Sequence, residues 1–165
     1  MSPVRNSGVV RLHGRFTRAC RWLESPFLLL VRLYWGWQFA QNGWAKLHHL
    51  HRVIGFFRSL GLPHPGLLAP FVASIELVGG ILLIIGLASR ITGLVLAIDM
   101  FMAYWTADRA ALHSIVRDPG TFYGADPYTF FFASLIVLIF GAGLFSLDAL
   151  IGRHSTAALP GKRRE

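Results

Sequence analysis

Charged side chains are scarce in this sequence. Lys, Arg, Asp and Glu together make up 15% of its 165 residues, and only eight residues are acidic. A soluble domain carries about 25% charged residues, so the composition argues against one. The mean hydropathy of +0.52 instead indicates a protein that lies in a lipid bilayer.

Cysteine and buried histidine are also lacking. Cys20 is the single cysteine, which excludes a disulfide within one chain and any dithiol–disulfide exchange that needs a pair. No histidine lies within an apolar stretch, and a buried haem needs axial ligands there. His48, His49, His51 and His64 lie between the stretches without a nearby carboxylate. We therefore expect neither haem nor a metal site.

Long apolar stretches are what the sequence does contain. A helix needs about 20 apolar residues to cross the hydrocarbon core, and a water-soluble bundle would need polar faces that "GGILLIIGLA" and "FFFASLIVLIFGAGLF" do not have. We predict an all-α membrane protein, an antiparallel bundle of four transmembrane helices. The four predicted spans are residues 27–46, 67–88, 91–107 and 128–147.

Amphipathic segments accompany the predicted spans. In residues 1–25, apolar side chains recur at helical spacing between arginines, which predicts an amphipathic helix at the membrane surface. "ESPF" predicts that the first span starts at Pro26 with Ser25 as its N-cap. Both longer loops also contain short amphipathic pieces, for which we expect surface helices. The chain thus divides into a basic segment 1–25, a membrane domain 26–151 and a basic tail 152–165.

Lys and Arg are distributed unevenly around these spans. Ten of the 16 precede the first span, lie in the short turn between the second and third, or follow the fourth. Five lie in the two longer loops, and Arg32 lies inside a span. By the positive-inside rule both termini face the cytoplasm. The net charge of +8 then reflects topology and attraction to lipid headgroups, and we expect no nucleic-acid partner.

Ionisable residues inside the spans are functional-site candidates, because they are costly in lipid. At 1.5 Å per residue, Glu76 and Gln38 both lie about 18 Å from the cytoplasmic end, Asp99 about 13 Å and Arg32 about 9 Å. These depths predict that the four side chains face the bundle interior. We expect Glu76 beside Gln38 and Asn42, and Arg32 reaching toward Asp99.

A polar stripe and a glycine pair flank this cluster. Gln38, Asn42 and Lys46 follow one another at intervals of four residues, which places them on one helix face. Gly79 and Gly80 in the second span would let a neighbouring helix or a flat ligand approach closely.

The residues leave two interpretations of the cluster open. In the first, Arg32, Glu76 and Asp99 form a clamp that fixes helix packing. In the second, the cluster is a proton-linked or quinone-linked site, in which the catalytic residues Glu76 and Asp99 move protons. The candidate residues for holding a quinone or another small ligand are then Arg32, Gln38, Asn42, Lys46, Gly79 and Gly80.

Three segments resemble the signatures of DoxX-type membrane proteins. They are "RLYWGWQFAQNGWAKL" from Arg32, "IELVGGILLIIGLASR" from Ile75 and "FGAGLFSLDAL" from Phe140. The resemblance covers about residues 27–151, and Glu–x–x–Gly–Gly with a downstream Gly–x–x–x–Arg is its most specific element. The chain departs from the pattern at Ala142, where the last motif usually has proline. It also has "ADPYTFF" where many members have a Gly–Tyr–Glu type sequence.

The resemblance implies a four-helix protein of the bacterial or archaeal inner membrane. The family takes its name from a subunit of a thiosulfate:quinone oxidoreductase, and other members are linked to complexes that handle thiol or oxidative stress. The implied role is the membrane subunit of such a complex, with the lipid bilayer and other subunits as partners; an oligomer is compatible with it. A non-catalytic scaffold or assembly partner is the alternative. A transporter or proton channel fits less well, because four short spans leave little room for alternating access.

Overall fold

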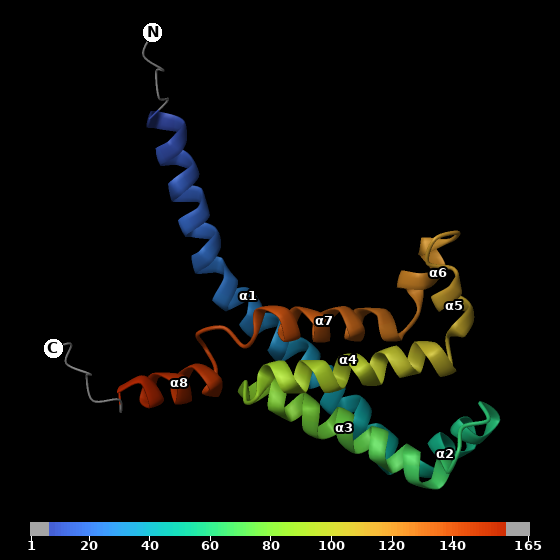
Figure 1. The fold of residues 1–165 in the computed structure, drawn as a ribbon. Helices are drawn as coiled ribbons and strands as arrows, with labels where there is room; N and C mark the ends of the chain where they lie inside the picture. Colours follow the sequence, from blue (N-terminus) through green and yellow to red (C-terminus); the bar gives the residue numbers. More distant parts are fainter. Residues whose placement is uncertain (1–6, 158–165) are drawn as a thin grey trace, which may run out of the picture.

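The computed structural model describes residues 7–157, which are mainly helical, with no strand in that range (Figure 1). The predicted all-α class is therefore confirmed. The helices are α1 (Ser7–His48), α2 (Leu50–Ser59), α3 (Pro65–Ile85), α4 (Ser89–Thr106), α5 (Arg109–His113), α6 (Pro119–Gly124), α7 (Pro127–Phe140) and α8 (Leu147–Ala157).

The four longest helices form two closely packed pairs. α1 packs along α3, and α4 packs along α7, while the short turn between α3 and α4 joins the pairs (Figure 1). α3 ends at Gly86, whose φ of 71° lies in the left-handed region that glycine adopts without strain. A buried cluster made of side chains from all four helices lies where the pairs meet: Phe39, Leu83, Leu96, Met100 and Val137.

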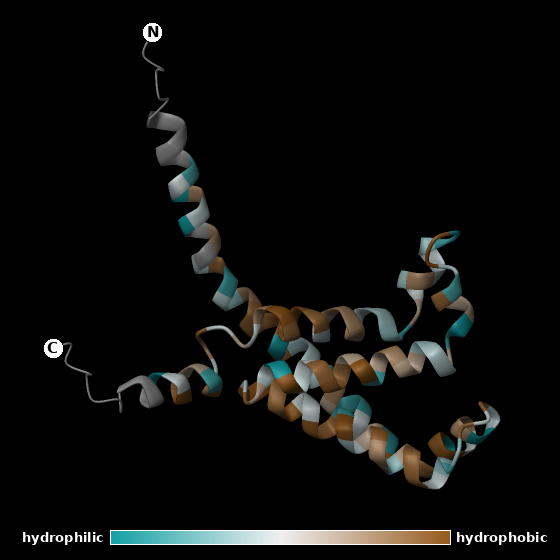
Figure 2. Cartoon of the chain, in the orientation of Figure 1, coloured by the Kyte–Doolittle hydropathy of each residue, from teal (hydrophilic) through white to brown (hydrophobic). Residues whose placement is uncertain are grey.

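Hydrophobic residues run along the helices of the bundle (Figure 2). Within residues 7–157, α3 is the one helix whose length and hydropathy suffice for a membrane span. α7 is also strongly apolar but has only 14 residues, about 21 Å of helix. Membrane crossing by α1, α4 and α7 stays a prediction from the sequence.

α1 is a single helix of 42 residues that continues through Pro26. The predicted helix start at Ser25 and Pro26 is therefore wrong. The Ser25 hydroxyl does not cap a helix there; it accepts a hydrogen bond from the backbone N–H of Leu144 at 3.3 Å. The N-terminal part of α1 extends away from the bundle (Figure 1), so the predicted amphipathic segment is not a separate element.

The predicted fourth span is too long at its C-terminal end. α7 stops at Phe140, and residues 141–146 are not helical. Gly141 and Gly143 have positive φ values of 80° and 71°, which a right-handed helix cannot contain. The sequence "FGAGLF" therefore ends the helix despite its hydropathy, and its backbone carbonyls become free to accept other hydrogen bonds.

Short helices occupy both longer loops, as the amphipathic pieces predict. α2 lies between α1 and α3, and α5 and α6 lie between α4 and α7. In the second loop the apolar residues of the predicted amphipathic piece are Ala111, Leu112, Ile115 and Val116. The first two lie in α5, whereas Ile115 and Val116 lie beyond its end at His113.

Glycines allow α1 and α3 to approach until their backbones touch. A Cβ atom on Gly80 would lie 2.5 Å from the backbone oxygen of Gly36 and 2.5 Å from the backbone nitrogen of Ala40. A Cβ atom on the neighbouring Gly79 would lie 2.9 Å from the side chain of Leu96 on α4. Both glycines thus contact helices, and their predicted place in a ligand pocket stays a prediction.

We predict that Gly80→Ala separates α1 from α3 and destabilises the protein. The new methyl group would overlap rigid backbone atoms, and overpacking of this kind costs about 1–3 kcal/mol. Gly55→Ala in α2 is the matched control, because a Cβ atom there meets nothing within 4 Å and alanine favours a helix. Thermal unfolding in detergent should give a lower Tm for Gly80→Ala alone. An unchanged Tm would contradict the close contact.

Candidate functional site

An ion pair between a buried carboxylate and a partly exposed lysine joins the two most closely packed helices. Lys46 Nζ on α1 donates to Glu76 Oε1 on α3 over 2.5 Å. The Glu76 side chain is 2% exposed, whereas the Lys46 side chain is 35% exposed. Glu76 thus faces the bundle interior, as its position in an apolar helix predicts, and the lysine offsets its charge.

Close backbone packing beside this pair positions both side chains. Gly43 lies against the backbone of Ala73 and Leu77, about one turn from Lys46 on α1. Leu77 directly follows Glu76. Because no Cβ atom separates the backbones here, the lysine needs only its own length to reach the carboxylate.

A second acid lies at the same level on α4. Gly79 contacts Leu96, and α3 and α4 run in opposite directions. Moving three residues back along α3 gives Glu76, and moving three residues forward along α4 gives Asp99, on the same helix faces. Asp99 is correspondingly within electrostatic range of both Glu76 and Lys46.

The two acids keep oxygens without hydrogen-bond donors. Glu76 Oε2 and Asp99 Oδ2 are both buried, and neither has a hydrogen-bond partner among the residues that the structure describes. Buried polar atoms are normally satisfied. We call Lys46, Glu76 and Asp99 the acid–lysine cluster.

The other two members of the polar stripe do not bond to this cluster. Gln38 is half-buried and Asn42 is exposed. Within the described part of the chain, neither side chain forms a hydrogen bond with Glu76. Lys46 is therefore the residue of the stripe that reaches the Glu76 carboxylate. The depth estimates did not predict this pair, because they ignored the length of the lysine side chain.

Arg32 lies apart from the cluster, so its predicted contact with Asp99 is wrong. Its side chain is 1% exposed and donates only to backbone carbonyls. Nε bonds to Leu83 at 3.0 Å, and Nη2 bonds to Phe145 at 2.9 Å and Ile84 at 3.4 Å, while Nη1 bonds to Ala142. The end of α3 and the non-helical segment after α7 supply these acceptors, and a guanidinium can serve several at once.

Asp148 completes this second arrangement and was not singled out from the sequence. Its carboxylate accepts from the backbone N–H groups of Ala88 at 2.7 Å and Ser89 at 2.8 Å, at the start of α4. Burial alone would raise the pKa of Asp148, but these hydrogen bonds and the nearby Arg32 hold it below its ordinary value. We call Arg32 and Asp148 the turn clamp, because together they hold the α3–α4 turn against residues 141–148.

A shallow hollow lies beside the turn clamp, not beside the acid–lysine cluster. Ser89, Arg90, Gly141 and Asp148 are among the residues that line it. Asp148 already occupies the start of α4 with its own negative charge. The hollow therefore offers no obvious place for a further anion.

A largely helical fold and a buried carboxylate that is paired with a lysine between apolar helices are typical of a membrane protein. The sequence profile of the DoxX family matches residues 27–109, which is half of the chain. The chain belongs to the DoxX family, and it is a membrane protein.

Two relatives extend this finding. "Putative oxidoreductase CatD" of Bacillus subtilis is 40% identical over 78 residues, which cover 47% of this chain and 57% of that protein. The match thus spans little more than half of that relative. "Uncharacterized membrane protein Rv3486" of Mycobacterium tuberculosis is 28% identical over 144 residues, 80% of this chain and 85% of that protein. No solved structure matches the chain.

We predict that Arg32→Lys destabilises the protein although it preserves the charge. A lysine presents its donors on one nitrogen and cannot reach carbonyls on two segments. Each charged hydrogen bond that is not remade should cost about 1.5–3 kcal/mol, measured as the free energy of unfolding in detergent.

Asp99→Asn is the matched test of the Arg32–Asp99 contact that the sequence predicts. It should leave the unfolding free energy close to that of the parent protein, because Asp99 does not bond to Arg32. An equal loss in both variants would contradict the turn clamp and restore the Arg32–Asp99 pairing.

Proposed function

We propose that this protein is a multi-pass inner-membrane subunit of a quinone-linked oxidoreductase complex, with the acid–lysine cluster as its proton-handling site. One observation carries the proposal: a buried carboxylate that is paired with a partly exposed lysine lies beside a second, half-buried acid. Each acid keeps one buried oxygen without a hydrogen-bond partner among the described residues. Ionisable groups inside membrane helices are costly and mark functional sites by default.

The charges in the cluster favour a role in proton transfer. Two carboxyl groups face one ammonium group, so a single lysine can balance only one ionised acid. A proton on the other acid would make the cluster neutral, and each acid has a free oxygen that can carry it. Lys46 holds one carboxylate in place, while its 35% exposed side chain leaves one edge of the cluster accessible.

The residues around the cluster fit a quinone only in part. A bound quinone supplies two-electron and two-proton chemistry. Arg32 fits the predicted role of holding a quinone carbonyl poorly, because backbone carbonyls accept hydrogen bonds from all three of its nitrogens. Gln38 and Asn42 can still offer amide groups beside Lys46, and Glu76 and Asp99 can exchange protons. The name of the Bacillus subtilis relative, an oxidoreductase, favours redox chemistry over transport.

A second candidate function is a non-catalytic scaffold. The turn clamp and the glycine contacts between α1 and α3 favour it, because both serve helix packing without any chemistry. In that case the acid–lysine cluster would only fix the register of α1, α3 and α4.

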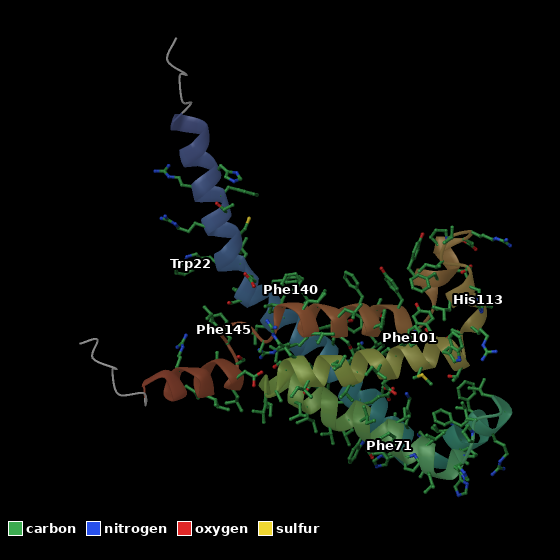
Figure 3. All side chains as sticks on the ribbon, viewed as in Figure 1. Trp22, Phe71, Phe101, His113, Phe140 and Phe145 are labelled. Atoms are coloured by element: carbon green, nitrogen blue, oxygen red, sulfur yellow. The ribbon has the colours of Figure 1, made fainter. Side chains whose placement is uncertain are left out.

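The proposed topology includes outward-facing apolar side chains and cytoplasmic termini. Phe71 on α3 and Phe140 on α7 point away from the bundle (Figure 3) and are 61% and 56% exposed, as lipid contact requires. The excess of Lys and Arg near both termini favours their cytoplasmic location.

We predict that the single cysteine reports this topology. Cys20 is exposed and precedes the first predicted span. A membrane-impermeant thiol reagent should leave it unmodified in intact spheroplasts and modify it in inverted vesicles. Arg58→Cys in a Cys20→Ser background is the control and should react in spheroplasts. Modification of Cys20 in intact spheroplasts would overturn the four-span arrangement.

We predict that Glu76→Gln abolishes quinone turnover without loss of protein. The amide keeps the shape of the side chain but cannot exchange a proton at neutral pH, and acid–base groups contribute about 10²–10⁴-fold to rates. The measurement is turnover of a short-chain quinone by complexes copurified from native membranes. Glu24→Gln, an exposed acid outside the predicted spans, should retain activity.

The same assay separates the two candidate functions. Under the scaffold alternative, Glu76→Gln would be mild and Glu76→Leu would lower the abundance of the protein in the membrane. Full activity of Glu76→Gln together with a low abundance of Glu76→Leu would refute the proton-handling role.

A further inference from the structure

The acid–lysine cluster is accessible near one end of the bundle. Lys46 lies two residues before the end of α1, and His48 and His49, which follow it, are exposed. The Lys46 side chain is itself 35% exposed, whereas Glu76 is buried. Asp99 is half-buried, but it lies near the middle of α4 and thus at membrane depth in the proposed topology. Lys46 is therefore the member of the cluster that water at this end of the bundle can reach.

Apolar side chains close the opposite end of the bundle. Four of them, one from each of the packed helices, are at most 1% exposed: Phe39, Leu83, Leu96 and Val137. Leu83 follows Glu76 by seven residues along α3, and Leu96 precedes Asp99 by three residues along α4. This layer thus lies between the acids and the α3–α4 turn. Beyond it, the buried Arg32 donates to backbone carbonyls, so a proton from that side meets a dry barrier.

We infer that Lys46 is a proton relay, through which Glu76 exchanges protons with the membrane face opposite to Cys20 and the α3–α4 turn. This inference rests on the proposed function and adds the side from which protons enter. The Lys46 ammonium donates to Glu76 Oε1 over 2.5 Å, so the proton moves along an existing hydrogen bond and leaves a carboxylic acid and a neutral amine. The amine then takes a proton from hydronium, which becomes water, and the net change is one proton moved from water to Glu76.

The chemistry of lysine suits this relay. Its flexible stem lets the ammonium group extend toward water while the methylene groups stay in apolar surroundings. A lysine ammonium that is partly desolvated can also lose its proton, whereas an arginine side chain stays protonated in proteins. An arginine in the same place would pair with Glu76 but could not pass a proton on.

Few charged groups act on the two acids. Lys46 from α1 attracts both, and the acids from α3 and α4 repel each other. On α4, the Tyr104 hydroxyl donates to the backbone carbonyl of Phe122, and Tyr128 is the one ionisable residue of α7. The other ionisable side chains near the accessible end are exposed: His48, His49, His51, Arg52 and Arg58.

The test reads the protonation of Glu76 from each side of the membrane. Sealed right-side-out vesicles that contain the full-length protein are loaded at one pH and suspended at another. They are then treated briefly with dicyclohexylcarbodiimide, a lipid-soluble reagent that modifies protonated carboxyl groups. Mass spectrometry measures the adduct on Glu76. Labelling of Cys20 with an impermeant thiol reagent in the same vesicles identifies the face on which the N-terminal part of α1 lies.

We expect the adduct on Glu76 to follow the pH on the face opposite to Cys20. Lowering that pH from about 8 to about 6 should raise the yield at least about threefold, because the protonated share of an acid rises as the pH falls. The same change on the Cys20 face should alter the yield by less than about 1.5-fold, because the apolar layer blocks exchange.

Lys46→Arg separates the relay from the ion pair. The guanidinium keeps the charge beside Glu76 but holds its protons, so the response to pH on the open face should fall to less than about 1.5-fold. Lys162→Arg, at the only other lysine of the chain, should respond like the parent protein. The comparison of the two faces in the parent protein decides the side of entry even if Lys46→Arg fails to accumulate.

The outcomes distinguish this inference from the proposed function. A yield that follows the pH on the Cys20 face overturns the side of entry but leaves a proton-handling role in place. A full response to pH in Lys46→Arg overturns the relay. A yield on Glu76 that follows neither pH, zero included, overturns both the inference and the proton-handling role.

Discussion

The contact between the backbones of α1 and α3 is the constraint on which the rest of the arrangement depends. Gly36, Gly43 and Gly80 leave no side chain between the two helices, so a lysine on one can reach a carboxylate inside the other. At the more usual interaxial distance of 8–10 Å, the same two side chains would have to extend further to meet. The ion pair is thus a consequence of how closely the helices pack as well as of their charges.

The protein separates two kinds of buried charge. At the α3–α4 turn, Arg32 and Asp148 bond to backbone groups that the helix ends leave unpaired. In the middle of α3 and α4, Glu76 and Asp99 keep unpaired oxygens. In the first arrangement the backbone satisfies the charged groups, whereas in the second each acid keeps an unpaired oxygen, and we place the proposed function at the second.

The sequence predicts the helices better than it predicts their partners. Hydropathy and glycine placement were sufficient for the all-helical class, the α3–α4 turn and the inward orientation of Glu76. The partner of Arg32 could not be predicted, because matching depths compares side chains only. Its true acceptors are carbonyls that exist because Gly141 and Gly143 end α7 early. The same glycines explain why an apolar run of 20 residues yields a helix of 14.

Pro26 illustrates a second limit of prediction from the sequence, which concerns where a helix begins. Proline after a capping residue is typical of a helix start, and here the preceding residues are helical as well. A proline near the middle of a helix costs a hydrogen bond, yet local rules cannot tell whether the flanking segments outweigh that loss. The result is one helix of 42 residues, about 63 Å long, roughly twice the thickness of the hydrocarbon core. Lys46 lies two residues from the end of this rod. The N-terminal part of α1 and the lysine that pairs with Glu76 therefore belong to one continuous helix, which Arg32 anchors between them to α3 and to residues 141–146.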